Sequence, residues 1–126
     1  MPVQLNHTIV WTHDNEASAR FIADLLGLPE PDRSDPFRIV RLENDVTLDF
    51  MDSERASTPG HYCFLITERE FDEVFGRIRE RGLDYWADPF HRDHGRYNTN
   101  DGGRGLYFAD LDGHNVEIIT RPYGSG

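Results

Sequence analysis

Two histidines and two carboxylates occupy matching places in the two halves of this chain. His7 lies in LNHTIVWT, and His61 lies in GHYCFLIT, 54 residues later. Asp49 lies in NDVTLDF, and Glu117 lies in DGHNVEI, 68 residues later. Imidazole and carboxylate groups are the side chains with which proteins hold divalent transition metals. If these four side chains converge, the chain holds a metal ion that acts on a small molecule.

The first half reads as a strand, a helix and further strands. Alternating residues predict a strand over residues 5–12, and Asp14 is placed to cap a helix that Gly27 ends. The helix carries apolar residues at four-residue spacing, namely Ala17, Phe21 and Leu25. The prolines of LPEPDRSDP mark a loop or a short edge strand. FRIVRL and VTLDFMD then predict two strands joined by a tight turn at residues 43–45.

The second half repeats this order after a linker over residues 53–60. HYCFLI predicts a strand, and Thr67 with Glu70 forms the capping box of a helix that Gly82 ends. The helix carries Phe71, Val74 and Ile78. LDYWADP predicts a short strand, and GLYFAD with HNVEII predicts a hairpin around residues 112–113.

The matching order indicates a duplicated strand–helix–three-strand unit within one α+β domain. Module 1 covers about residues 4–53 and module 2 about residues 59–121. The second module is longer because of the segment FHRDHGRYNTNDGGRG. Its many Gly, Asn and Asp residues predict a mobile lid over residues 88–105 that controls access to the metal, and the alternative is that this segment packs against the partner of a dimer.

The strand patterns predict which side chains share a face. Asp49 alternates with the apolar Leu48 and Phe50, and Glu117 alternates with apolar neighbours in the same way. His61 is likewise expected to face away from an apolar surface. Three of the four candidate ligands therefore lie on the strand faces opposite the predicted helices.

Composition excludes several function classes. The formal net charge of −10 argues against nucleic acid and anionic membranes as partners. All basic residues are Arg, so Schiff-base chemistry through a lysine is excluded. The single cysteine fits a reducing cytosol and is expected to be a small buried apolar residue. The N-terminus resembles no signal peptide, and no apolar run is long enough to span a bilayer. These features predict a cytoplasmic protein.

At the motifs HTIV, GHYCFLI and YFADLDGHNVEII, the chain resembles the vicinal oxygen chelate superfamily, which includes glyoxalase I, extradiol dioxygenases, fosfomycin-modifying enzymes and bleomycin-resistance proteins. The resemblance covers nearly the whole chain. It implies two βαβββ modules that form a curled, incomplete β-barrel around a metal-binding cavity. It also implies His7, His61 and Glu117 as ligands of a divalent metal (Fe, Mn, Ni, Zn or Co), with Asp49 as a fourth ligand or a general base. Short members of this family pair as homodimers.

Other positions bear on the reaction. Tyr107, ten residues before Glu117, resembles the active-site tyrosine of extradiol dioxygenases and is a catalytic candidate together with Asp49. Trp11 stands where glyoxalase I has an arginine, and Ile9 stands where fosfomycin enzymes have a threonine. No named activity therefore transfers intact. The expected cavity has aromatic walls formed by Trp11, Phe50, Trp86 and Tyr107, and His114 is expected to be exposed beside its turn.

Two functions remain open at this point. The first is a metal-dependent enzyme, a lyase, isomerase or dioxygenase, that binds a small organic substrate through two adjacent oxygens. The metal would act as a Lewis acid that stabilises the enolate, alkoxide or catecholate formed during the reaction. The alternative is a binding protein of the bleomycin-resistance type, which sequesters a toxic aromatic molecule.

Overall fold

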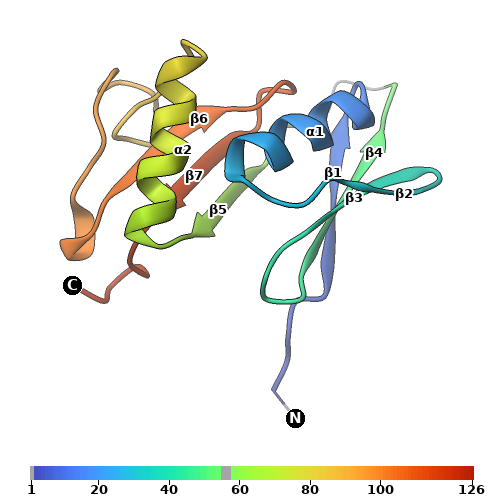
Figure 1. The fold of residues 1–126 in the computed structure, drawn as a ribbon, viewed down its shortest axis with the longest axis horizontal. Helices are drawn as coiled ribbons and strands as arrows, with labels where there is room; N and C mark the ends of the chain where they lie inside the picture. The colour runs from blue at the N-terminus through green and yellow to red at the C-terminus, as the bar shows by residue number, and fades with distance from the viewer. Residues whose placement is uncertain (1, 55–57) are drawn as a thin grey trace. The chain divides into compact units, whose positions relative to one another are not determined.

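The computed structural model describes residues 2–54 and 58–126, so the middle of the predicted linker, residues 55–57, lies outside the described part. The chain divides into two compact units, Met1–Thr58 and Pro59–Gly126. Each unit contains one long helix and its own open β-sheet (Figure 1). The fold class is α+β, as predicted, and the boundary between the units falls within the predicted linker.

The first unit has a four-stranded sheet in the order β1-β4-β3-β2. The strands are β1 (His7–Thr12), β2 (Asp32–Ser34), β3 (Phe37–Arg41) and β4 (Thr47–Asp52). β1 runs parallel to β4, and β3 runs antiparallel to both of its neighbours. The short β2 is an edge strand, which fits the proline-rich segment that precedes it.

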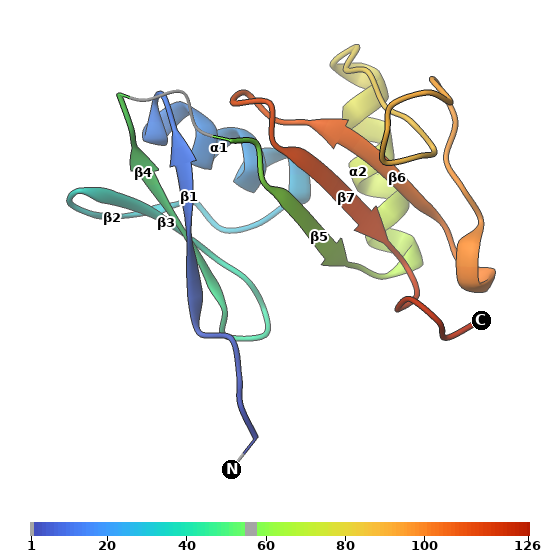
Figure 2. The same ribbon diagram turned by 180° about the vertical axis from the view of Figure 1, so that it is seen from behind.

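Helix α1 (Asn15–Leu26) begins and ends at the residues that the sequence predicts. The Asp14 carboxylate accepts the backbone N–H of Ala17 at 3.1 Å, and Gly27 ends the helix with φ 71°. α1 lies across one face of the sheet in both views (Figures 1 and 2). The predicted apolar face was partly wrong, because Ala17 is exposed and Ile22 is buried instead. A strict four-residue spacing drifts around a helix of 3.6 residues per turn, so it loses the buried face.

The core of the first unit lies between α1 and the sheet. Its buried apolar side chains are Val10, Ala19, Ile22, Ala23, Leu25, Val40, Leu48 and Phe50. Phe50 is 1% exposed, so the expectation that it lines a cavity was wrong. Strand alternation explains this, because Phe50 shares the face of Leu48 and points away from the face of Asp49.

The second unit has a three-stranded sheet in the order β5-β7-β6. The strands are β5 (His61–Leu65), β6 (Gly105–Ala109) and β7 (Asn115–Ile119), and η1 (Asn100–Gly102) is a short 3-10 turn. β5 is parallel to β7, and β6 is antiparallel to β7. The sheet therefore repeats the parallel pairing of first and last strands seen between β1 and β4.

Helix α2 (Glu68–Glu80) covers one face of this second sheet in both views (Figures 1 and 2). The capping box of Thr67 and Glu70 is present, as predicted, with both of its hydrogen bonds. The predicted apolar face is also confirmed, because Phe71, Val74 and Ile78 are buried. The sheet supplies Leu106, Phe108, Val116 and Ile118 to the same core.

The segment LDYWADP forms no strand, so that prediction was wrong. Isolated bridges join Trp86 to Tyr107 and to His94. The backbone groups of Trp86 and Tyr107 exchange two hydrogen bonds of 2.9 and 2.8 Å. The chain then turns at Asp88 and Pro89, and proline cannot donate to a continuing ladder.

The inserted segment over residues 88–105 follows a course fixed by many contacts. The Asp88 carboxylate accepts the backbone N–H groups of Phe90, Arg92 and Asp93 at 3.2, 2.9 and 2.7 Å. The His91 ring stacks on Trp86 with centroids 3.9 Å apart. A lid function for this segment stays a prediction. In the described part of the chain, no helix has the length and apolar character needed to cross a membrane.

Candidate metal centre

Strand pairing in the second unit brings His61 and Glu117 together. β5 and β7 are parallel neighbours in which Cys63 pairs with Glu117 and His61 with Asn115. Glu117 and His61 consequently lie on the sheet face opposite α2, and His61 Nε2 lies 3.1 Å from Glu117 Oε1. Glu117 is 1% exposed, whereas about half of the His61 side chain is exposed. One candidate ligand is thus buried, and the other reaches solvent.

The geometry of this pair suits a shared metal ion. Two ligand atoms that bind a metal at about 2.1 Å lie about 3.0 Å apart at a right angle and about 3.4 Å apart at the tetrahedral angle. The 3.1 Å between His61 Nε2 and Glu117 Oε1 falls within this range, and it is also an ordinary hydrogen-bond distance. His61 Nδ1 lies 3.0 Å from the backbone oxygen of Asn115, so it donates its N–H there and turns Nε2 toward Glu117. This is the arrangement that metal-binding histidines commonly adopt.

Two tyrosines surround the buried carboxylate. Tyr123 donates its hydroxyl proton to Glu117 Oε2 at 2.5 Å, and the Tyr107 hydroxyl lies 3.3 Å from that of Tyr123. The Tyr107 ring stacks over His61 with centroids 6.0 Å apart. Burial, and then the hydrogen bonds with Tyr123 and Glu117, raise the pKa of Tyr107 well above its usual value. Tyr107 therefore keeps its proton at neutral pH.

Cys63 lies on the same face, beside Glu117. The residue is exposed, so the expectation of a buried position was wrong. Its strand position explains this, because it alternates with Tyr62 and Phe64 and faces away from α2. The residue as a whole is exposed, but its thiol is partly buried, and this partial burial and the adjacent Glu117 charge raise the pKa of Cys63 to about 12. The thiol is thus poorly suited to act as a nucleophile.

In the first unit, His7 and Asp49 share the sheet face opposite α1. β1 pairs His7 with Thr47 and Ile9 with Asp49, so the two candidate ligands are diagonal neighbours. The Thr47 hydroxyl donates to Asp49 Oδ1 at 2.8 Å. His7 is exposed, and its Nδ1 lies 2.7 Å from Asn6 Oδ1. His7 and Asp49 thus lie on the strands of the first unit that correspond to those of His61 and Glu117, and their role as ligands stays a prediction.

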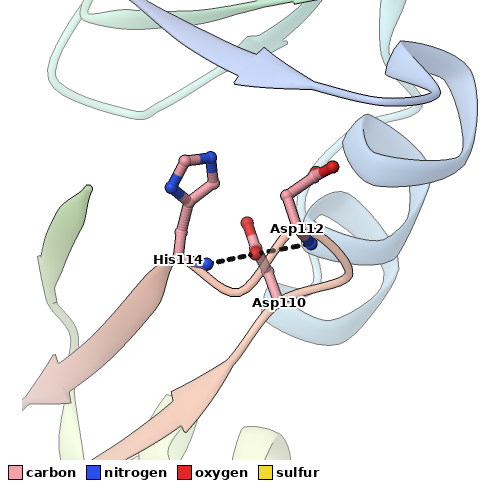
Figure 3. A group of neighbouring side chains, drawn as sticks. All are labelled: Asp110, Asp112 and His114. Atoms are coloured by element: carbon pink, nitrogen blue, oxygen red, sulfur yellow. Dashed lines mark hydrogen bonds between the residues drawn. The ribbon is translucent and has the colours of Figure 1, made fainter. Parts of the chain in front are cut away.

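A third group of potential ligands lies in the turn between β6 and β7 (Figure 3). One ligand atom from each of Asp110, Asp112 and His114 lies within 4.8 Å of the others. Asp110 Oδ1, however, accepts the backbone N–H groups of Asp112 and His114 at 2.9 and 2.8 Å, which builds the turn. Burial also raises the pKa of Asp110, which disfavours the charged form that a metal requires. This group is therefore a weaker candidate than His61 and Glu117.

His114 is buried at 3% exposure, so the expectation that it is exposed was wrong. Its Nδ1 accepts the backbone N–H of Gly60 at 2.7 Å, and its ring meets Tyr62 edge-on. These contacts join the start of β5 to the start of β7. They hold the strand carrying His61 against the strand carrying Glu117.

The glyoxalase/bleomycin resistance protein/dioxygenase superfamily model matches residues 4–118. The chain belongs to this superfamily. Members of the superfamily use divalent metal ions, in agreement with the metal-binding character predicted from the sequence. The F-x-D-x-D-G-x-x-x-E motif of this superfamily corresponds here to the turn of Asp110 and the ligand candidate Glu117.

Solved structures with high similarity carry the name oxidase. The chain is 61% identical to oxidase ChaP-H1, with a TM-score of 0.95 over 98% of this chain and 99% of that one. It is 62% identical to oxidase ChaP-H2, with a TM-score of 0.97 over 100% of this chain and 99% of that one. A curated relative, glutathione transferase FosA of Serratia marcescens, is 26% identical and is matched over 90% of this chain and 78% of that one.

Sequence reasoning missed two residues that contact His61 and Glu117. Tyr123 follows the last strand, where no periodic pattern indicates a direction, and only its position six residues after Glu117 could have drawn attention to it. Asn115 acts through its backbone oxygen, which any residue type provides. The alternation of polar and apolar residues along a strand therefore predicts neither contact.

Proposed function

We propose that this protein is a metal-dependent oxidase or dioxygenase that binds a small organic substrate through two adjacent oxygens. His7, His61 and Glu117 hold the metal in a two-histidine, one-carboxylate set. The observation that supports this most directly is the 3.1 Å pair of His61 Nε2 and Glu117 Oε1. The likeness to two oxidases at above 60% identity favours oxidation over isomerisation.

Three protein ligands on one side would leave other coordination positions for the substrate. The two-histidine, one-carboxylate set is typical of non-haem Fe(II) oxygenases. When bound, the metal supplies Lewis acidity and the capacity to react with dioxygen. Iron is therefore the metal we propose, and Mn, Ni, Zn and Co are the other candidates that the ligand types allow.

Asp49 and Tyr107 have different proposed roles beside the metal ligands. Asp49 serves as a general base or as a fourth ligand, and the Thr47 hydroxyl holds one of its oxygens. Tyr107 keeps its proton because its pKa is raised, so it serves as a hydrogen-bond donor rather than as a base. Its ring, stacked over His61, also places an apolar wall beside the site.

His7 belongs to the first unit, whereas His61 and Glu117 belong to the second. We propose that the protein is a homodimer, as short members of this family are. β1 and β5 each have one strand neighbour among the described residues, so each keeps an edge that a further strand can pair with. Trp11 and Leu65 on these strands are 42% and 60% exposed.

Oxygen uptake tests the proposed reaction. The protein, stripped of metal and reloaded anaerobically with Fe²⁺, is mixed with aromatic compounds that carry two adjacent hydroxyl or carbonyl oxygens. We expect one of these compounds to cause oxygen consumption that needs Fe²⁺ and disappears in His61→Ala. Metal-independent binding of the same compounds, without oxygen consumption, would contradict the proposal and support a sequestering protein instead.

A further inference from the structure

We propose that Tyr123 is a positioning residue of the metal centre, whose hydroxyl holds Glu117 Oε2 so that Oε1 alone faces the metal beside His61 Nε2. This inference rests on the proposed metal-dependent function. It assigns a role to the C-terminal segment 121–126, which lies beyond the last strand of the fold. Tyr123 acts through Glu117 and not on the substrate.

The two oxygens of Glu117 have separate partners. Oε1 lies 3.1 Å from His61 Nε2, and Oε2 accepts the Tyr123 hydroxyl proton at 2.5 Å. The Glu117 side chain is 2% exposed, so solvent is a poor replacement for a lost donor. A hydrogen bond to a buried carboxylate is stronger than one between neutral groups, and it fixes the plane of the carboxylate. The result is a ligand oriented to bind with one oxygen.

The role of Tyr123 depends on its hydroxyl more than on its ring. The residue is 65% exposed, which is unusual for a tyrosine whose main contribution is core packing. Its hydroxyl nevertheless reaches Glu117 and also lies 3.3 Å from the Tyr107 hydroxyl. A change that removes only this oxygen therefore tests the proposal with little loss of apolar contact.

The backbone around Tyr123 is held in place by its own hydrogen bonds. Ser125 donates its backbone N–H and its hydroxyl to the Pro122 oxygen at 3.1 and 2.6 Å, which closes a turn around Tyr123. Gly124 donates its N–H to Asp101 Oδ1 at 3.1 Å. In both views the C-terminus ends beside η1, which contains Asp101 (Figures 1 and 2). The inserted segment is thus connected to Glu117 through the C-terminal turn.

Removing the Tyr123 hydroxyl should change metal binding in two ways. Glu117 loses an orienting partner, and such losses typically cost roughly 10–100-fold in metal affinity. Oε2 also becomes available to the metal, so the carboxylate can bind through both oxygens. A Co²⁺ ion at the site reports this second change, because its visible spectrum depends on the number and geometry of its ligands.

The experiment compares Co²⁺ affinity and the Co²⁺ visible spectrum of the metal-free full-length protein and its variants. Tyr123→Phe should bind Co²⁺ about 10-fold or more weakly and give a shifted spectrum. Tyr97→Phe is the matched control, because Tyr97 packs edge-on against Phe71 and Phe75 on the helix side of the same unit. It should behave as the parent protein does. Thermal unfolding of each metal-free variant separates a loss of folding from a loss at the site.

A second pair of variants tests the turn without changing the tyrosine. Asp101→Gly removes the carboxylate that accepts the Gly124 N–H, and both residue types tolerate the φ of 58° at this position. Asp101→Asn keeps an acceptor. We expect Asp101→Gly to shift the Co²⁺ spectrum in the direction of Tyr123→Phe, and Asp101→Asn to restore the parent spectrum.

Glu117→Gln separates failure of this inference from failure of the proposed function. If Glu117→Gln loses Co²⁺ but Tyr123→Phe retains the parent affinity and spectrum, the metal centre stands and the role of Tyr123 is wrong. If Glu117→Gln binds Co²⁺ as tightly as the parent, the metal centre itself is wrong and the role of Tyr123 falls with it. A melting temperature lowered in Tyr123→Phe with an unchanged spectrum would also overturn the inference, because it indicates a purely structural role.

Discussion

Cys63 lies on the same strand face as His61 and next to Glu117, yet its thiol should react slowly. Burial of the thiol, followed by the charge of Glu117, raises its pKa to about 12. Only the thiolate attacks alkylating reagents, so we expect iodoacetamide to label the folded metal-free protein at pH 8 on the order of 100-fold more slowly than the urea-unfolded chain. Mass spectrometry over time measures both rates.

Glu117→Gln provides the comparison for this prediction. It removes the carboxylate charge but leaves the burial, so labelling of Cys63 should become faster without reaching the unfolded rate. Equal labelling rates in the folded parent and the unfolded chain would show that the thiol has an ordinary pKa.

For individual residues, the sequence could predict the face on which a side chain lies when the residue belongs to a regular strand. The shared face of His61 and Glu117 could be predicted because strand alternation fixes a face and the duplication supplies a second example of the pattern, whereas their role as ligands stays a prediction. Tyr123 and the Asn115 carbonyl could not be found, since a turn after the last strand and a backbone oxygen follow no periodicity. His114 was misjudged because proximity to a turn says little about a side chain that accepts the Gly60 N–H.

The capping box at the start of α2 makes a measurable contribution to stability. Thr67 accepts the N–H of Glu70 at 3.1 Å. We expect Thr67→Ala to lower the free energy of unfolding by about 1 kcal/mol, because one N-terminal N–H loses its partner. Urea unfolding measures the change.

Thr99→Ala is the matched control for the cap. Thr99 precedes η1, and its side chain makes no capping hydrogen bond there. Its substitution should change the free energy of unfolding by less than about 0.5 kcal/mol. Equal losses in the free energy of unfolding would show that the capping hydrogen bond of Thr67 contributes no more to stability than the Thr99 side chain does.

The turn at Asp88 should protect the inserted segment from hydrogen exchange. Hydrogen bonds from backbone N–H groups, the first from Asp93, lower the pKa of Asp88. This stabilising effect is present above the ordinary carboxyl pKa and is lost as the pH falls through the lowered one. At neutral pH, Asp88→Ala should therefore speed exchange at Phe90, Arg92 and Asp93, whereas Asp88→Asn should have a smaller effect.

The same exchange experiment bears on the sequence-based view of this segment as a mobile lid. Exchange at these three amides that is equally fast in the parent and in Asp88→Ala would contradict the fixed turn. Composition indicated mobility because it counts Gly, Asn and Asp residues. It could not reveal that Asp88 bonds three backbone groups or that His91 stacks on Trp86.

Most elements could be predicted, and the failures have local causes. Caps at Asp14 and Thr67 located both helix starts to the residue. The segment LDYWADP has the composition of a strand, but whether it pairs depends on a distant partner, and only Trp86 finds one. Such non-local pairing is the reason why strands are harder to predict than capped helices.

At the scale of the whole molecule, we predict a homodimer in solution. The edges of β1 and β5, together with exposed Trp11 and Leu65, provide surfaces that a second chain can cover. Light scattering at micromolar concentration should give twice the mass of one chain. A monomer at that concentration would contradict the prediction.

Mixed dimers determine whether each site takes ligands from both chains. If so, His7→Ala and Glu117→Ala chains, each unable to hold metal tightly, should regain one intact site per heterodimer when they are mixed and refolded together. Metal content unchanged by mixing would indicate that each site forms within one chain.

The central claim is that one divalent metal is held by His7, His61 and Glu117, and metal analysis tests it most directly. The protein is purified without chelators or a nickel column, and its metal content is measured by mass spectrometry beside that of His61→Ala. We predict about one divalent ion per chain in the parent and none in His61→Ala, because losing one of three or four ligands leaves a weakly chelating site. A parent without metal after reloading, or a His61→Ala variant that binds metal as tightly as the parent, would contradict the claim.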